Sequence, residues 1–255
     1  MLKRGQISIF LIIGIVIVVA LGVFIALKTN VRDIVKGPGF YGGVNDVRRF
    51  VDACISDVSD NGIKIIGLQG GYYEVPFILK FTHVDGTNTD ITYGYDYFLD
   101  QSWMPATLNV VEEELIKYIK LNMLGCVDSF KAFYEDGYNV KTRMRDMYVD
   151  VNFLEDGTQV DVKWKIELEK GDNRAELFDF GIKKFPYRLK KMYNIERDIV
   201  NNFVSGEYPE VDVSYLINQN VCPIADECLF VSEERLVFML TDTYKGKEFN
   251  YVFAA

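Results

Sequence analysis

The hydrophobic pattern separates an unbroken apolar run near the start of the chain from a body in which apolar and polar positions alternate. The run begins at Ile7, ends at Leu27 and contains no charged residue. As a helix rising about 1.5 Å per residue, it would be about 31 Å long, close to the thickness of the hydrocarbon core of a bilayer. Cleaved secretory leaders have shorter apolar regions of about 7–15 residues. The pattern therefore predicts a transmembrane anchor, with a buried helix of a soluble core as the alternative.

The residues after this run predict a hinge followed by a separate domain. The stretch GPGFYGGVND, residues 37–46, contains four glycines and one proline, a composition typical of a flexible linker. We expect a signal and anchor segment over residues 1–36, a linker over residues 37–44 and a globular domain over residues 45–255. Small residues suited to close contact between membrane helices occur within the anchor at Gly14, Gly22 and Ala26.

Helical spacing of apolar residues predicts three helices in the domain. Asn45 is a suitable N-cap for the first helix, which places Cys54 on its apolar stripe. The second helix is expected over residues 107–134, with Cys126 on its apolar side. The third is expected over residues 187–204.

Alternation with a period of two predicts antiparallel strands. The clearest signal lies in residues 148–182, where alternating apolar positions are interrupted by the turn sequences Asp156-Gly157 and Gly171-Asp172-Asn173. One buried and one wet face are typical of a meander laid over helices. Further strands are expected at residues 77–84, 91–98, 211–217, 229–231, 236–242 and 245–255. The predicted fold class is α+β: one N-terminal transmembrane helix, then a globular domain of antiparallel sheet packed on about three helices.

The charge balance restricts the partners. The chain has 37 acidic and 28 basic residues and a net charge of −9, so binding to the phosphate backbone of nucleic acid is not expected. A hydrophobic fraction of 49% indicates a packed core rather than a disordered tail. We expect membrane lipid as a partner through the N-terminal helix, self-association or other surface proteins as further partners, and no nucleic acid.

The cysteines indicate the redox compartment. The chain has four, at Cys54, Cys126, Cys222 and Cys228, with no C-x-x-C pair. Because there is also a single histidine, disulfides are a better interpretation than a zinc site. Of the three possible pairings, the pattern favours Cys54 with Cys126 and Cys222 with Cys228, since the second pair closes a short loop around Pro223. Four reduced and buried thiols, as in a cytosolic protein, are the alternative.

The start of the apolar run resembles a known class of signal. The basic pair in KRGQ precedes Gly5 and Gln6, as in the archaeal class III signal segments of type IV pilin-like proteins. The resemblance implies cleavage after Gly5, so that the mature chain begins at Gln6, and an envelope protein whose globular part lies outside the cell. The sequence departs from the family at Phe10, where the family has a glutamate implicated in filament packing. The resemblance therefore does not extend to polymerisation into a pilus.

Two stretches of the domain carry a second resemblance. The segments CISDVSDNGIKIIGLQGGYY, residues 54–73, and YIKLNMLGCVDSFKAFYEDGYNV, residues 118–140, resemble the ectodomains of a group of archaeal membrane-anchored proteins that begin with this kind of leader. The group implies no established activity. Together the two resemblances imply a single-pass protein of the cell membrane, with its N-terminus in the cytoplasm and its C-terminal domain extracellular.

The sequence offers few groups for catalysis. Phosphate-binding loops, nucleophile turns and zinc helices have no counterpart, and His83 lies in a predicted strand. We therefore assign no catalytic residue, no cofactor and no metal, and interpret DGTNTD at residues 85–90 as a turn, with calcium binding as the alternative. The candidates for ligand contact are Gln69, Tyr72, Tyr73 and Tyr93.

These patterns favour one class of function. The chain is expected to be a non-enzymatic, membrane-anchored cell-surface protein of pilin-like type, with a structural or adhesive role and a disulfide-stabilised ectodomain. An extracellular ectodomain that binds or senses a ligand is the first alternative. An anchored hydrolase, which needs two facing carboxylates in a cleft, is the second.

Overall fold

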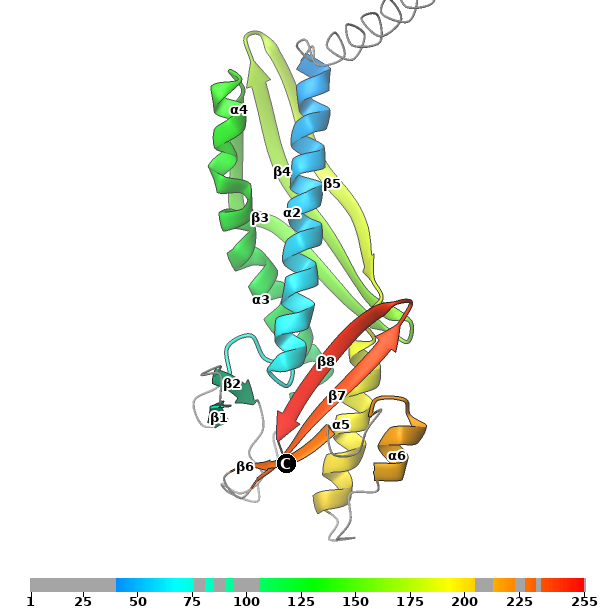
Figure 1. Ribbon diagram of the computed structural model, residues 1–255. Coiled ribbons are helices and arrows are strands. Elements are labelled where there is room, and N and C mark those ends of the chain that lie inside the picture. Colours follow the sequence, from blue (N-terminus) through cyan, green and yellow to red (C-terminus); the bar gives the residue numbers. More distant parts are fainter. Residues whose placement is uncertain are drawn as a thin grey trace, which may run out of the picture. The chain divides into compact units, whose positions relative to one another are not determined.

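The computed structural model describes residues 40–75, 81–84, 90–93, 106–204, 213–222, 228–232 and 235–254 (Figure 1). By its contacts the chain divides into residues 1–47 and residues 48–255. The predicted anchor from Ile7 to Leu27, the processing site at Gly5 and Gln6, and the small residues within the anchor all lie outside the described residues. Across the part of the chain that is described, no helix has the length and apolar character needed to cross a membrane.

The first described helix starts earlier than the sequence pattern predicts. Helix α2 spans Phe40–Leu68, so residues 40–44, which were expected to belong to the linker, are helical. Glycine inside a helix costs about 1 kcal/mol relative to alanine, which disfavours Gly42 and Gly43 without forbidding them. Once a helix is nucleated, each residue added to it is ordered in exchange for one hydrogen bond. The favourable helix that follows can therefore extend back through these glycines. The linker prediction is therefore wrong at its C-terminal end.

The second predicted helix is interrupted. Helix α3 spans Leu108–Val127, and the Thr107 side chain accepts a hydrogen bond from the Val110 amide at its start. A short 3-10 segment, η2 (Asp128–Phe130), then separates α3 from helix α4 (Lys131–Glu135). All three residues of η2 have positive φ, at 41°, 51° and 60°. The break brings the buried Phe130 ring to 6.1 Å from the Trp164 ring, so packing against the sheet overrides helical propensity here.

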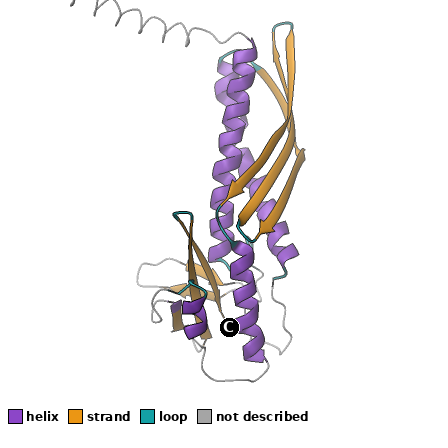
Figure 2. Cartoon of the chain, turned by 90° about the vertical axis from the view of Figure 1, so that its right-hand side faces the viewer, coloured by secondary structure: helices purple, strands orange, loops and turns teal. Residues whose placement is uncertain are grey.

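The predicted meander is confirmed. Strands β3 (Asn139–Leu154), β4 (Gly157–Lys170) and β5 (Asn173–Phe185) form an antiparallel sheet in the order β3-β4-β5. The inward positions of the central strand are completely buried, namely Val160, Val162, Trp164, Ile166 and Leu168. Figures 1 and 2 show α2 and α3 side by side on one face of this sheet. The core lies between that face and the two helices, which leaves the other face in water.

A second sheet follows in the chain. Strands β6 (Leu229–Ser232), β7 (Arg235–Tyr244) and β8 (Lys247–Ala254) are antiparallel in that order, as the alternation of the C-terminal residues predicts. Helix α5 spans Leu189–Val204, close to the predicted third helix. Strands β1 (Phe81–Val84) and β2 (Asp90–Tyr93) pair with each other, and His83 stands opposite Ile91.

One strand prediction is wrong. Residues 211–217 were expected to form a strand, but Val213–Asn218 is helix α6. In this helix Leu216 is fully buried and its neighbour Ile217 is 47% exposed. The helix closes through a hydrogen bond from the Val221 amide to the Leu216 carbonyl oxygen, and the Val221 carbonyl then accepts from the Thr241 amide of β7.

Both predicted disulfides are present. Cys54 of α2 is bonded to Cys126 of α3 across 72 positions of sequence, with 5.7 Å between their Cα atoms. Cys222 is bonded to Cys228 across 6 positions, and no cysteine of the chain is free. The first bond joins the two helices that cover the sheet, and the second closes the short segment that leads into β6.

Gly157 explains why the first turn of the meander needs glycine. Its φ is 146°, and a side-chain carbon built there would lie 2.2 Å from the Phe185 carbonyl oxygen of β5. Replacing Gly157 with alanine should lower the free energy of unfolding by about 3 kcal/mol, because the φ is strained and the neighbouring backbone must move. The matched control is Gly171→Ala at the other turn: its φ is also positive, at 59°, but the described neighbours leave open space, so its smaller loss reports the backbone strain without the clash. Denaturant unfolding of both variants checks the prediction, and equal losses would contradict it.

Candidate functional site

The segment that carries three of the predicted ligand contacts is an elbow between α2 and the rest of the domain. Gly70 and Gly71 have φ values of 61° and 95°, and the Gly71 amide donates to the Ile66 carbonyl oxygen at 2.9 Å. A side-chain carbon at Gly71 would lie 2.8 Å from the Val111 side chain of α3. The elbow therefore needs glycine both for its backbone angles and for its close approach to α3.

A carboxylate of α3 holds this elbow in place. Glu114 accepts hydrogen bonds from the Tyr73 amide at 3.0 Å and the Glu74 amide at 2.8 Å. Lys117 adds an ion pair to Glu74 at 2.6 Å, and the Tyr73 ring packs edge-on against Tyr118 at 4.9 Å. The sequence analysis did not single out Glu114 for this role. An acid near a helix start, facing consecutive backbone amides, became recognisable only when the fold brought the elbow to it.

Three of the four candidates for ligand contact make contacts within the elbow or with α3. Tyr72 is 8% exposed, and Tyr73 lies against Tyr118. With the Gln69 amide in the orientation that satisfies its neighbours, its nitrogen donates to the Tyr72 and Tyr73 carbonyl oxygens at 2.9 and 3.0 Å. Tyr93 pairs with Phe81 in the β1-β2 hairpin, and its side chain lies outside the described part. The structure brings Gln69, Tyr72 and Tyr73 together, but as parts of one internal turn.

A buried acid that the sequence pattern did not single out lies between α5 and β8. Glu196 is 5% exposed, and its carboxyl group accepts a hydrogen bond from the Tyr251 hydroxyl at 2.6 Å. Burial raises the pKa of Glu196 to about 8, an effect that the hydrogen bond from Tyr251 opposes in part. The pKa of Tyr251 is raised well above its ordinary value, first by burial and then by the nearby Glu196. Perturbed groups of this kind occur at functional sites and in structural cores alike.

A second buried acid is an ion-pair centre. Asp242 of β7 is 1% exposed and accepts hydrogen bonds from Arg188 at 2.8 and 2.5 Å and from Lys191 at 3.3 Å. Lys191 also donates to the Gln219 carbonyl oxygen at 2.8 Å. These contacts tie the start of α5 to β7 and to the segment after α6. Since both cations are satisfied, the arrangement is suited to fixing elements rather than to binding an anion.

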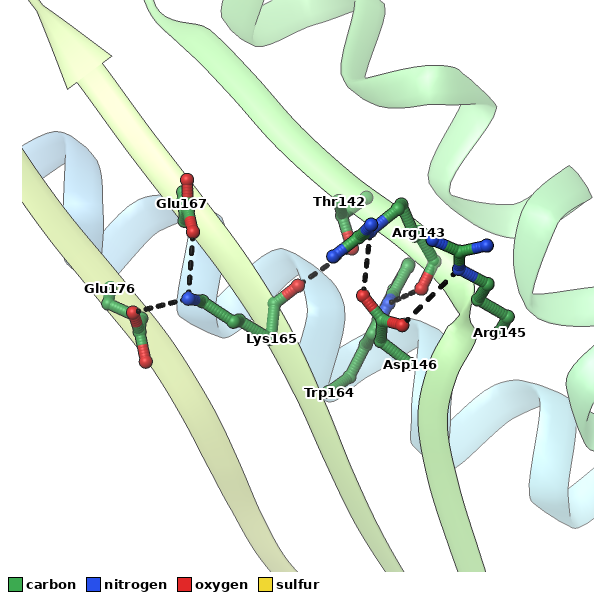
Figure 3. Close-up of polar contacts among 8 residues, drawn as sticks. All are labelled: Thr142, Arg143, Arg145, Asp146, Trp164, Lys165, Glu167 and Glu176. Carbon is green, nitrogen blue, oxygen red and sulfur yellow. Dashed lines mark hydrogen bonds and ion pairs between the residues drawn. The ribbon is translucent and has the colours of Figure 1, made fainter.

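The outer face of the meander carries a mixed-charge cluster at a break in register (Figure 3). Pairing shifts between Thr142 and Met147, and Trp164 donates its ring N–H to the Arg143 carbonyl oxygen at 3.2 Å. Arg143 and Arg145 both contact Asp146, at 2.9 and 3.7 Å. The same face carries Lys165, which is paired with Glu167 and Glu176 at 2.8 and 3.2 Å. The opposite charges balance, so this cluster shapes the bulge and does not form a basic patch.

Helix α3 carries two exposed leucines that are neighbours on its surface. Leu121 and Leu124 are 57% and 53% exposed, although the opposite side of the helix is buried. Within the described structure, nothing lies within 4 Å of the position that a side-chain carbon of Gly125 would take. Exposed leucines that are neighbours on a helix are typical of contact surfaces.

No family model, no curated protein and no solved structure matches this chain. Among the described residues, no group of three or more His, Cys, Asp or Glu side chains is arranged to hold a metal ion. Within the described structure, the exposed leucines of α3 are the candidate contact surface.

Proposed function

We propose that this chain is a membrane-anchored cell-surface protein with a structural or adhesive role, its N-terminus in the cytoplasm and its domain outside the cell. The observation that carries the proposal is the pairing of all four cysteines. Disulfides persist in oxidising compartments and are rare where glutathione and thioredoxin keep thiols reduced. The pairing supports an extracellular position for the domain.

The apolar run supports the anchor. Its length matches the bilayer core, and basic residues flank it on both sides, so charge alone does not orient it. Placing the disulfides on the oxidising side selects the orientation in which the few residues before Ile7 stay inside. The resemblance of KRGQ to class III signals supports the same orientation and cleavage after Gly5.

The use of the polar side chains supports a structural role over a catalytic one. Glu114 holds the elbow, Asp242 holds two cations, and Glu196 meets a tyrosine hydroxyl in the core. Each of these groups joins elements of the domain to one another. A partner would therefore bind at the surface of the domain, above all at the exposed side of α3.

Cell fractionation tests the proposal. The full-length chain should remain with membranes after carbonate extraction, and protease added to intact cells should digest the domain. Mass spectrometry without reductant should give two disulfides and a mature N-terminus at Gln6. Recovery in the soluble fraction without detergent, or digestion only after lysis, would contradict the proposal.

A variant and its matched control test whether the apolar run causes the membrane association. Val16→Arg with Val19→Arg places two charges near the middle of the run, where each costs about 3 kcal/mol of insertion free energy, so the membrane-bound fraction should fall. The control, Asn173→Arg with Asn201→Arg, adds the same charges at exposed positions of the domain and should leave fractionation unchanged.

A further inference from the structure

The turn between α3 and α4 has a strained backbone. Asp128, Ser129 and Phe130 all have positive φ, and none of them is glycine. In this left-handed region the Cβ atom lies too close to the following carbonyl oxygen, so residues other than glycine adopt it singly rather than in succession. The sequence pattern predicts one helix over residues 107–134, straight through this stretch. Contacts elsewhere in the fold must therefore hold the left-handed turn in place.

Helix α2 is attached to both sides of this turn. Before the turn, Cys126 is bonded to Cys54 of α2. After the turn, the Phe133 ring lies 5.5 Å from the ring of Phe50, which is one helical turn before Cys54 on α2. A change of the three residues to right-handed geometry rotates the chain after the turn relative to the chain before it. The turn can therefore relax only if one attachment opens, and the disulfide is the covalent one.

The disulfide at this attachment is accessible from one side. Cys126 is half-buried, whereas Cys54 is 3% exposed. Within the described structure, the space beside the neighbouring Gly125 is open. Both cysteines of the other disulfide, Cys222 and Cys228, are buried. Exposed or strained disulfides are reduced more easily than buried ones, and they include the regulatory disulfides.

We propose that the Cys54–Cys126 disulfide is a redox-sensitive latch on the turn between α3 and α4. A dithiol reductant opens it: one thiolate attacks the sulfur of Cys126 and displaces the sulfur of Cys54, which takes up a proton. The second thiol of the reductant, as a thiolate, then displaces the sulfur of Cys126, which is protonated in turn. The reductant leaves as its own disulfide, and both cysteines are thiols. With the latch open, Asp128, Ser129 and Phe130 move to right-handed geometry and α3 continues into α4.

Opening the latch changes the surface that α4 forms. The Tyr134 hydroxyl donates to the Val140 carbonyl oxygen of β3 at 2.6 Å, and this tyrosine is 47% exposed. Rotation of α4 breaks that hydrogen bond and moves the exposed ring. The inference goes beyond the proposed cell-surface function, because it concerns how a reductant alters this surface, and the purified chain decides it wherever the domain resides.

Partial reduction of the purified full-length chain tests which disulfide opens first. The dithiol dithiothreitol is added without denaturant, free thiols are alkylated at intervals, and mass spectrometry assigns them. Cys54 and Cys126 should be alkylated at least about ten times faster than Cys222 and Cys228, because only the first disulfide is accessible. The monothiol glutathione should form its mixed disulfide with Cys126. Equal rates for the two disulfides, or a mixed disulfide at Cys54, would refute the latch.

Glycine substitution tests the coupling between the disulfide and the turn. Ser129→Gly should relieve strain in the closed form and weaken the helical form, since glycine adopts positive φ freely and is a poor helix former. The equilibrium constant for reduction by dithiothreitol should therefore fall about fivefold. The matched control is Lys245→Gly, in the turn between β7 and β8, where φ is also positive, at 50°. It relieves the same kind of strain away from this disulfide, so the constant should stay unchanged.

The outcomes distinguish a latch from a static cross-link. A fall confined to Ser129→Gly supports the latch, and it is small beside the loop-closure contribution of the disulfide, so the closed bond still stabilises the domain. A chain recovered in the soluble fraction would refute the anchor and leave this result unaffected. An unchanged constant in Ser129→Gly means that the turn keeps its geometry after reduction. An equal fall in both variants means that the turn has no special coupling to the disulfide, and either result overturns the inference.

Discussion

Replacing Cys54 and Cys126 with alanine should lower the free energy of unfolding by about 4 kcal/mol. The bond closes a loop between positions 72 apart, and the chain-entropy model gives a loss of this size when such a loop is opened in the unfolded state. In a domain of this length, 4 kcal/mol corresponds to a fall in the melting temperature of about 10 °C. Thermal and denaturant unfolding of the full-length chain, with and without the substitutions, measure the effect.

The second disulfide provides an internal control. Cys222 and Cys228 are 6 positions apart, so the same model gives about 2 kcal/mol for Cys222→Ala with Cys228→Ala. The two losses should therefore differ by about a factor of two. The first pair also joins α2 to α3, so its removal should increase hydrogen exchange in both helices, whereas removal of the second should act near β6. Equal effects of the two pairs would contradict the loop-length explanation.

The parts of the fold that the sequence predicts well are those fixed by local pattern. The meander follows from strict alternation and from turn sequences whose glycine is needed for geometric reasons, as Gly157 illustrates. The disulfide between Cys54 and Cys126 follows from the placement of both residues on apolar helix faces. In each case short-range chemistry and the final packing agree, so the local signal is sufficient.

The parts that were missed depend on contacts between distant residues. The break after Val127 has no proline or glycine at its three positive-φ residues, and it exists where the buried Phe130 meets Trp164. Helix α6 stands where a strand was expected, and its Leu216 is fully buried. Neither the break after Val127 nor helix α6 can be predicted from a short segment of sequence, because tertiary contacts override local propensity.

The candidate site shows the same division. Sequence analysis named Gln69, Tyr72 and Tyr73 as candidates for ligand contact, and the structure adds that the glycines beside them fold this segment onto α3. The exposed leucines of α3 could have been found by comparing both sides of the predicted helix rather than its apolar stripe alone. The buried Glu196 also had a signal, because it lies one turn after Met192 on the buried side of α5. An acid on the buried side of a helix is expected to have a raised pKa, because burial disfavours its charged form.

Glu196 makes the stability of the domain depend on pH in an unusual direction. Its pKa is about 8 in the folded protein, against 4.5 for the unconstrained side chain, because burial penalises the charged form. Between these two values the folded state holds a proton that the unfolded state has lost. The free energy of unfolding should therefore fall as the pH rises from about 4.5 to about 8, by at most about 1.4 kcal/mol per pH unit and by about 4 to 5 kcal/mol in total.

The described neighbours of Glu196 include hydroxyl groups that can contact its charge. Tyr251 of β8 donates the one hydrogen bond shown to its carboxyl group, at 2.6 Å, and that bond is the factor that lowers the pKa. Tyr72 from the elbow and Tyr193 from α5 also lie near this pair within the described structure, and both carry hydroxyl groups rather than cations. By contrast, the equally buried Asp242 has Arg188 and Lys191 against it. Among the described residues, cations contact Asp242, whereas the contact shown for the Glu196 carboxyl group is with a tyrosine hydroxyl.

Glu196→Gln should remove this pH dependence. Glutamine keeps the shape and an acceptor for the Tyr251 hydroxyl but has no proton to lose, so the variant should be close to the native protein near pH 5 and more stable than it near pH 8. Glu248→Gln, at an exposed position of the same strand as Tyr251, is the matched control and should retain the native slope. Denaturant unfolding of the three proteins between pH 5 and pH 8.5 measures it. Parallel curves for the native protein and the Glu196 variant would mean that this acid is ionised in the fold, and that another group stabilises its charge.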